Sequence, residues 1–313
     1  MLKIAIQTAG WLDLNAPENG FKMASEAGFD AVEFSVDALL PTLRQMTKDP
    51  ACVTSVLERS EDELKALLAP VKAAAEKYGI SVAQVAAPTP ITVADRDDIT
   101  ALYKLGFERA LFLCAYFGAP VLTLSLPSKA TRAEEREANL ALLREAAAVA
   151  KKGGFRIALT NAVVPVGARF YEGPALRISD ALFYIDTLNA ELGEQVLGAC
   201  YNTGNANLVP QKPLADLTTL GERVIAMQVS DNNRDYDIRQ IPFTQSNRIT
   251  VHSQYSYFNW ENFIKGLAAC NYQGALSFDV RGAMNDFPAP LHADAMRLTA
   301  AVGRYMLEEA AKS

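Results

Sequence analysis

The feature of this sequence that most restricts its fold is a regular alternation of short apolar runs with longer amphipathic segments. The amphipathic segments, such as residues 62–78 and 134–152, carry apolar side chains three and four positions apart, which is typical of helices. The strand-like runs lie at residues 3–8, 30–35, 81–86, 120–126, 156–161, 197–202, 224–230 and 274–280. Alternating strands and helices form parallel sheets, and eight repeats favour a closed barrel over an open sheet. We therefore predict an α/β fold of the (β/α)8 TIM barrel class.

Glycine-containing turns separate several predicted helices from the strands that follow, at Gly28, Gly79, Gly118 and Gly154. Glycine ends helices readily because it adopts left-handed backbone angles without steric cost. The first predicted strand is followed by Thr8-Ala9-Gly10-Trp11, which lacks the GxGxxG pattern of dinucleotide-binding folds. One barrel accounts for all 313 residues, so we expect a single domain over residues 1–313.

Composition excludes several classes of partner. The net charge is −6, and the basic residues are scattered, so we expect no nucleic-acid partner. The chain enters a strand-like run at once and carries no apolar stretch of about 18 residues, so we expect no membrane partner and a cytoplasmic location. The four cysteines form no CxxC pair, and the two histidines, His252 and His292, are too few for an imidazole-rich metal site.

Two segments are longer than a barrel connection requires, residues 36–61 and 231–260. Both follow the carboxyl end of a predicted strand, which is the face where barrel loops build binding sites. We expect these segments to form walls or lids of a cavity.

Motifs at the predicted strand ends resemble the sugar phosphate isomerase/epimerase branch of the xylose-isomerase-like barrels. They occur in order and at the right spacing, and Asn139 also fits: GFDAVEF at 28–34, LTN at 159–161, YNTGNANL at 201–208, MQVSDN at 227–232 and NYQGALSFD at 271–279. The resemblance implies the barrel fold and proton transfer next to a sugar carbonyl.

The resemblance also implies four strand-end metal ligands, supplying about three negative charges and one imidazole. In this chain those positions are Thr160, Asn202, Gln228 and Asp279, which offer one carboxylate and neutral donors. Such a set holds transition metals poorly. We therefore expect no metal ligands and no cofactor, or at most a weakly bound divalent cation.

Two carboxylates near strand ends are candidate catalytic groups, Asp279 and Glu33, each with a purely structural role as the alternative. We expect substrate-binding roles for Thr160, Asn202, Gln228, Asp231, Arg239, Arg281 and Trp11. The loops after the last two strands also carry Arg234 and Arg248, which could bind an anionic group or pair with neighbouring aspartates. His252 and the aromatic residues Tyr255, Tyr257, Phe258 and Trp260 are either site or packing residues.

These observations predict a sugar (phosphate) isomerase/epimerase-like protein with a degenerate metal site, acting on or binding a small polyhydroxylated molecule, with or without an anionic group. The alternative is a non-catalytic sugar-binding or regulatory protein on an isomerase scaffold. The sequence decides neither whether the protein is an enzyme nor its oligomeric state.

Overall fold

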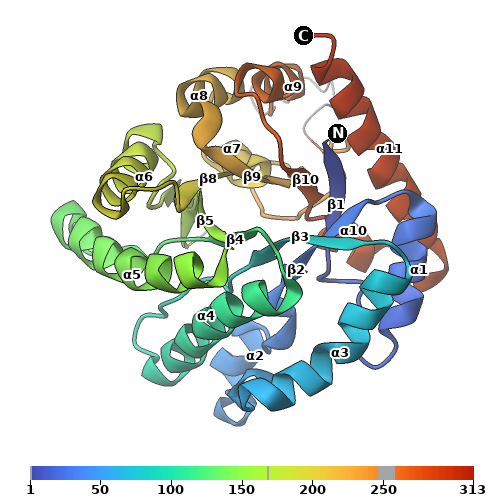
Figure 1. The fold of residues 1–313 in the computed structure, drawn as a ribbon, viewed down its shortest axis with the longest axis horizontal. Coiled ribbons are helices and arrows are strands. Elements are labelled where there is room, and N and C mark those ends of the chain that lie inside the picture. Colours follow the sequence, from blue (N-terminus) through green and yellow to red (C-terminus); the bar gives the residue numbers. More distant parts are fainter. Residues whose placement is uncertain (1, 168, 246–257) are drawn as a thin grey trace.

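Parallel strands closed into a barrel form the centre of the molecule (Figure 1). The structure, a computed structural model, describes residues 2–167, 169–245 and 258–313. In that part of the chain eight strands close the barrel in the order β1-β10-β9-β8-β5-β4-β3-β2. Their bounds are Lys3–Gln7 (β1), Ala31–Ser35 (β2), Ser81–Ala86 (β3), Val121–Leu124 (β4), Arg156–Thr160 (β5), Leu197–Asn202 (β8), Val224–Val229 (β9) and Ala275–Phe278 (β10). Each predicted run contains one of them, so the predicted fold class is confirmed.

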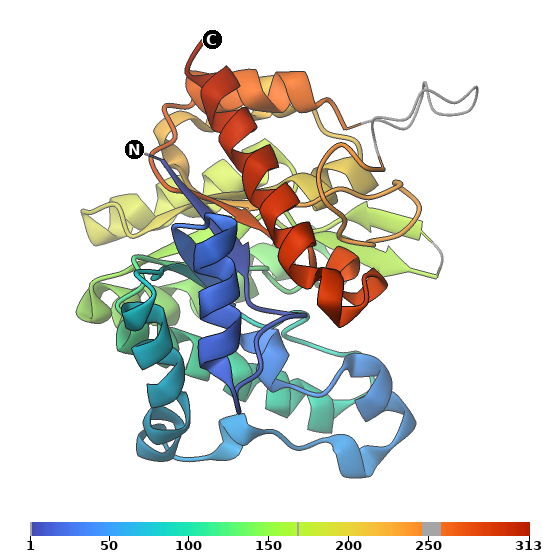
Figure 2. The same ribbon diagram turned by 90° about the vertical axis from the view of Figure 1, so that its right-hand side faces the viewer.

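Helices surround the barrel, following the strands in sequence (Figure 1). The longer ones are α1 (Pro17–Ala27), α3 (Glu61–Lys77), α4 (Asp97–Phe117), α5 (Arg132–Gly153), α6 (Ile178–Leu192), α8 (Pro213–Leu220), α9 (Trp260–Ala269) and α11 (His292–Ala310). Short helices lie at the strand ends, namely α2 (Leu43–Lys48), α7 (Thr203–Leu208) and α10 (Arg281–Asp286). In Figure 2 the first and last long helices, α1 and α11, lie side by side. No helix among the described residues combines the length and the apolar character that a membrane crossing requires.

Local sequence explains where the helices begin and end. Thr131 accepts a hydrogen bond from the backbone of Glu134, whose side chain bonds back to Thr131, and this capping box starts α5. Gly154 then ends α5 with φ +72°, in the left-handed region that favours glycine. The other predicted glycine turns, at Gly28, Gly79 and Gly118, also have positive φ.

The alternation of side chains along each strand builds the interior in layers. Ala5, Ala31 and Ala275 fill the barrel near the amino ends of their strands. Two residues further along, Glu33 and Ser277 lie in a polar layer, because side chains two apart share one face of a strand. The intervening residues, such as Ile4 and Phe278, pack against the surrounding helices. The layered interior directs polar groups toward the carboxyl ends of the strands.

Three insertions stand at the carboxyl ends of the strands. The first, after β2, contains the 3-10 helices η1 (Val36–Leu39), η2 (Pro50–Cys52) and η3 (Val56–Glu58) together with α2. The second was not predicted: β6 (Val163–Val166) and β7 (Arg169–Glu172) pair as an antiparallel hairpin directly after β5. The third follows β9, where Asp231 and Gln240 form an isolated antiparallel bridge. In Figure 2 the hairpin and the segment after β9 project from the same side of the barrel.

Candidate active site

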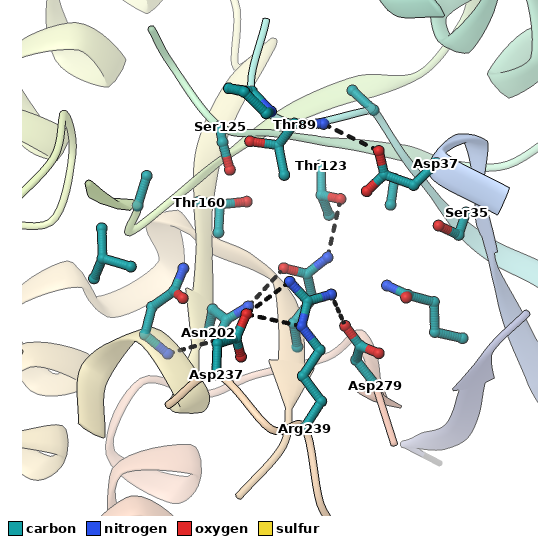
Figure 3. A pocket seen from close by; sticks show the side chains of 18 of the residues that line it. Ser35, Asp37, Thr89, Thr123, Ser125, Thr160, Asn202, Asp237, Arg239 and Asp279 are labelled. Atoms are coloured by element: carbon teal, nitrogen blue, oxygen red, sulfur yellow. Dashed lines mark hydrogen bonds and ion pairs between the residues drawn. The ribbon is translucent and has the colours of Figure 1, made fainter. Parts of the chain in front are cut away.

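A cavity of about 290 Å³ opens at the carboxyl ends of the barrel strands (Figure 3). This volume lies near the lower limit of roughly 300–1,000 Å³ typical of small-molecule sites. Of its 22 described lining residues 14 are polar or charged, and the charged ones are Asp37, Asp237, Arg239, Asp279 and Arg281. The cavity therefore suits a small molecule with many hydrogen-bonding groups.

The four substituted strand-end positions meet in this cavity. Thr160 ends β5, Asn202 ends β8, Gln228 lies one residue before the end of β9, and Asp279 follows β10. The Nδ2 atom of Asn202 donates to the Oε1 atom of Gln228 over 3.1 Å, so two of the four are directly joined. The structure thus brings together the four strand-end residues that the family resemblance singled out as the positions of metal ligands.

Asp279 is held by two guanidinium groups. Its Oδ1 atom accepts from Nε of Arg281 at 3.0 Å, and its Oδ2 atom accepts from Nη1 of Arg239 at 2.7 Å. Burial alone would raise the pKa of Asp279, but the positive charges of Arg239 and Arg281 outweigh burial and lower that pKa. Asp279 is therefore a stable anion with both oxygens engaged, which makes it a poor proton acceptor.

Glu33 has the opposite surroundings. It is completely buried and accepts hydrogen bonds from Gln7 at 3.1 Å, Gln84 at 2.8 Å, Gln228 at 2.6 Å and the hydroxyl of Ser277. All four donors are neutral, and burial raises the pKa of Glu33. Glu33 is not among the described residues that line the cavity. It lies one layer below the cavity.

The position of Glu33 fixes the orientation of the cavity amides. Gln7 and Gln228 both turn their NH2 groups toward Glu33, so their carbonyl oxygens face away from it. The Gln7 oxygen accepts from Arg281, and the Gln228 oxygen accepts from Asn202. Glu33 is therefore a positioning residue for the cavity floor.

Asp37, which the sequence analysis did not single out, lines the cavity from η1 (Figure 3). Its Oδ1 atom accepts from the backbone N–H of Thr89 at 3.2 Å. Burial raises the pKa of Asp37, although the charges of Arg281 and Arg239 counteract part of this effect. The signal that could have found Asp37 is the one used for Asp279, an acidic residue just beyond the end of a barrel strand.

Trp11 and Asp231 lie outside the described lining of the cavity. The indole N–H of Trp11 donates to the backbone oxygen of Gln7, and its ring lies in a neighbouring depression that shares Asp37 and Arg281 with the cavity. Asp231 is buried, and its carboxylate accepts from the backbone N–H groups at residues 232 and 245. These contacts make Asp231 a stabiliser of the segment after β9.

None of the remaining candidates is among the described residues that line the cavity. Phe258 and Trp260 are buried and pack on each other and on Phe263. Asn139 is buried in α5 and donates to the backbone oxygen of Pro127. Arg234 is not among the described residues that line the cavity. Four candidates lie outside the described residues: Arg248, His252, Tyr255 and Tyr257.

The β6–β7 hairpin supplies an apolar wall that the sequence analysis missed. Val163, Pro165 and Phe170 line the cavity. Pro165 and Phe170 are partners in the hairpin register, and Val163 lies two residues before Pro165, so all three share one face. Of the two long segments predicted as walls, the first contributes Asp37 and Leu43 and the second contributes residues 237 and 239.

The donor set does not fit the divalent metal that the fold family implies. Asn202 Oδ1 accepts from a backbone N–H at 2.9 Å, Gln228 Oε1 accepts from Asn202, and both Asp279 oxygens are bonded to guanidinium groups. A divalent cation beside Asp279 would meet two arginine charges at close range. Among the described residues, no group of three or more His, Cys, Asp or Glu side chains is arranged to hold a metal.

Fold and site together define a (β/α)8 barrel with a cavity at the carboxyl ends of its strands. The chain belongs to the xylose isomerase-like TIM barrel family, whose model matches residues 21–301. Among proteins with curated functions, none matches this chain in sequence.

Solved structures share the whole fold at low sequence identity. A structure of L-ribulose 3-epimerase has a TM-score of 0.65 at 17% identity, covering 100% of this chain and 96% of that one. A D-psicose 3-epimerase determined in the presence of D-fructose has a TM-score of 0.64 at 14% identity, with 98% and 99% coverage. The 3-keto-D-glucoside 4-epimerase of E. coli has a TM-score of 0.64 at 17% identity, with 97% and 100% coverage. At these identities the likeness establishes the fold.

Proposed function

We propose that this chain is a sugar isomerase/epimerase-like protein that binds a small, neutral, polyhydroxylated carbonyl compound and moves a proton at the carbon beside the carbonyl. Family membership and the sugar epimerases among the similar structures support the class of ligand. The many polar side chains in the described lining of the cavity support the same class, because each sugar hydroxyl needs a hydrogen-bonding partner once it leaves water.

The charges around the cavity favour a neutral ligand over a phosphorylated one. The sequence left an anionic ligand open because of its loop arginines. Arg239 and Arg281 are instead paired with Asp237 and Asp279, and Asp37 adds a further carboxylate to the described lining. Aspartates outnumber arginines there, so a phosphate group would meet net negative charge.

The position of the Asp37 carboxylate in the cavity, together with its raised pKa, is the observation that carries the proposed chemistry. Its carboxylate faces the cavity, and its pKa is raised, whereas Asp279 is held ionised by arginines. Two carboxylates whose environments push their pKa values apart are typical of acid/base sites. Asp37 is therefore the proton acceptor and donor in the proposal, and Asp279 organises the positive charge opposite.

The proposed step moves protons and electron pairs only within the ligand and between the ligand and Asp37. The Asp37 carboxylate takes the proton from the carbon beside the carbonyl, the C–H electron pair forms the new C=C bond, and the carbonyl π pair moves onto its oxygen. The proton then returns to the former carbonyl carbon. The hydroxyl on the carbon that lost its hydrogen passes its proton to the oxyanion, its O–H electron pair forms the new C=O bond, and the isomer results. A single carboxylate acting on one face favours isomerisation, because epimerisation needs a proton donor on the opposite face.

Proton exchange in D2O tests the proposal. The purified chain is incubated with D-fructose, D-tagatose, D-allulose or L-ribulose, and NMR follows the signals of the protons beside the carbonyl. We expect one of these ketoses to exchange and to form an aldose, while D-fructose 6-phosphate binds more weakly than D-fructose in calorimetric titration. Ketose binding without exchange would instead support the sugar-binding protein.

A matched pair of aspartate variants locates the base. Asp37→Asn keeps the shape and removes the proton acceptor, so the exchange rate should fall by about 100-fold or more. Asp186→Asn removes an aspartate that pairs with Arg223 on the exposed surface, so the rate should stay unchanged. Equal exchange rates in Asp37→Asn and wild type would place the base elsewhere.

A further inference from the structure

The segment after β9 is built so that Arg239 reaches into the cavity together with Asp237. The antiparallel bridge between Asp231 and Gln240 closes this segment into a loop, with backbone hydrogen bonds of 2.8 Å in both directions. Within the loop Arg239 has φ +46°, a left-handed conformation that is uncommon for residues other than glycine. Strained backbone persists where the surroundings hold it in place, and such positions cluster at functional sites.

The start of α10 holds the strained residue in place. The backbone N–H of Gly282 donates to the carbonyl oxygen of Arg239 at 3.1 Å. A Cβ atom at position 282 would lie 1.7 Å from the carbonyl oxygen of Ile238, so only glycine allows the loop to approach this closely. The backbone of Arg239 is thus fixed from two sides.

The guanidinium group is fixed as well. Its Nη1 atom donates to Asp279 at 2.7 Å, and its Nε and Nη2 atoms both contact one oxygen of Asp237 at 2.9 Å. In Figure 3 the group lies between these two aspartates inside the cavity. Each Nη atom carries a second hydrogen, and no contact within the described residues engages it. Those hydrogens are available to an oxygen of a bound ligand.

We infer that the guanidinium of Arg239 is the fixed cation of this site and replaces the divalent metal that the fold family implies. It contacts Asp279, the one carboxylate among the four strand-end positions, and shares the cavity with Thr160, Asn202 and Gln228. A guanidinium presents a planar fork of donors that keeps its charge at every relevant pH. Its free N–H bonds polarise the ligand carbonyl and stabilise the oxygen anion that forms when the neighbouring carbon loses its proton.

This inference rests on the proposed function for its catalytic half, whereas the replacement of the metal is testable without any sugar. Mn²⁺ alone is titrated, by calorimetry and by electron paramagnetic resonance, into wild type and into variants that restore charged ligands. The restored chain carries Thr160→Glu, Asn202→Asp and Gln228→His. It is compared with the same chain carrying Arg239→Ala in addition.

We expect no stoichiometric Mn²⁺ in wild type. In the restored chain, removal of Arg239 should tighten Mn²⁺ binding by about 100-fold or more, because a positive charge next to Asp279 repels the ion. Adding Arg304→Ala to the restored chain is the control, since Arg304 pairs with Asp30 at the amino end of β2. One Mn²⁺ per wild-type chain, or equal affinity with and without Arg239, would overturn the inference.

If the restored chains do not fold, a second measurement tests whether the guanidinium group of Arg239 occupies the cation position of the cavity. Arg239→Ala alone leaves a space of guanidinium shape beside two aspartates, so low millimolar guanidinium chloride should raise its melting temperature. Wild type and Arg304→Ala should show no such rise. Absence of the rise in a folded Arg239→Ala chain would contradict the assigned place of the cation.

The rate of proton exchange in a ketose tests the catalytic role of Arg239 separately. With the ketose that exchanges in wild type, Arg239→Ala should lose exchange by about 100-fold or more, the usual effect of removing one such donor. Guanidinium chloride should restore part of the rate, and EDTA should not change the wild-type rate. Undiminished exchange in Arg239→Ala would refute the role of Arg239. Absence of exchange in wild type would refute the proposed function, while the Mn²⁺ titrations would still decide whether Arg239 replaces the metal.

Discussion

Glu33 and Asp279 are two buried carboxylates in one barrel with opposite surroundings. Glu33, on β2, accepts hydrogen bonds from three amides and a hydroxyl, and its pKa is raised. Asp279, just beyond β10, is bonded to two guanidinium groups, and its pKa is lowered. Burial is similar for the two, so burial does not decide the outcome. The charge of the hydrogen-bond donors decides it.

The difference follows from depth in the barrel. Glu33 lies inside the barrel, where its partners are side chains of other barrel strands: Gln7 and Gln84 come from the neighbouring strands, and Gln228 and Ser277 come from β9 and β10. Asp279 lies at the strand ends, where the loop after β9 and the start of α10 bring in long cationic side chains. The inner layer therefore orients amides, while the outer layer carries the charges that act on a ligand.

The largest expected effect comes from removing the charge of Asp279. Asp279→Asn leaves the guanidinium groups of Arg239 and Arg281 without their shared carboxylate in a site where they are only about a quarter exposed. Removal of one partner from a largely buried ion pair costs about 3–5 kcal/mol of unfolding free energy. Urea unfolding at neutral pH measures it. A loss near zero would show that the arginines find other partners and would break the contrast with Glu33.

The next largest effect is expected for Gly282→Ala, which tests whether the shape of the loop after β9 places Arg239 beside Asp279. In Gly282→Ala the new Cβ atom cannot coexist with the backbone oxygen of Ile238, so the loop that carries Arg239 must move. We expect a loss of about 3 kcal/mol, at the upper end of overpacking effects, together with a fall in ketose exchange. Gly193→Ala is the control for adding a Cβ atom without a collision, since Gly193 has nothing within 4 Å of a new Cβ atom and only its positive φ disfavours alanine. Its cost should be only about 1–2 kcal/mol, with unchanged exchange.

Removal of the carboxylate from Glu33 should cost less than removal from Asp279. Glu33→Gln keeps one acceptor oxygen but places an NH2 group where donors from Gln84 and Ser277 already converge. A buried donor without an acceptor costs about 1–3 kcal/mol. Denaturant unfolding beside Asp279→Asn gives the comparison directly. A greater loss in Glu33→Gln would mean that the neutral network contributes more to stability than the ion pairs.

The sequence was sufficient to predict the barrel because strand and helix periodicities depend on neighbouring residues. It also grouped Thr160, Asn202, Gln228 and Asp279, because the carboxyl ends of parallel strands share one face of a barrel. The pairing of Asp279 with Arg239 was not predictable, since it depends on the left-handed backbone of Arg239 and a close backbone approach at Gly282.

Two other features were missed for related reasons. The hairpin at 163–172 has strands of only four residues, with Pro165 inside one of them, so its periodicity is too short to detect. The surroundings of Glu33 come from side chains on four different strands, and only the barrel register brings these together. Contacts between distant segments therefore limited the prediction of the site more than that of the fold.

The smallest effect is a difference in pH dependence, and it has opposite signs for the two carboxylates. Glu33 binds its proton more tightly in the folded state, because its pKa is raised, so folding loses stability as pH rises above the ordinary glutamate value of about 4.3. Asp279 binds its proton less tightly in the folded state, so its contribution is complete above the ordinary aspartate value of about 3.9 and is lost as pH falls below it. Burial raises the pKa values of Cys200 and Tyr272, which lie near Glu33, so both groups stay neutral in this range and do not alter the comparison.

Unfolding free energies of wild type, Glu33→Gln and Asp279→Asn, measured from pH 3 to 8, test these signs. The stability of wild type relative to Glu33→Gln should decline as pH rises above the ordinary glutamate value. Its stability relative to Asp279→Asn should instead decline as pH falls below the ordinary aspartate value, because protonation breaks the pairing with Arg239 and Arg281. If both differences changed in the same direction with pH, burial would dominate both carboxylates. The guanidinium groups would then contribute too little charge at Asp279 to take the place of a metal.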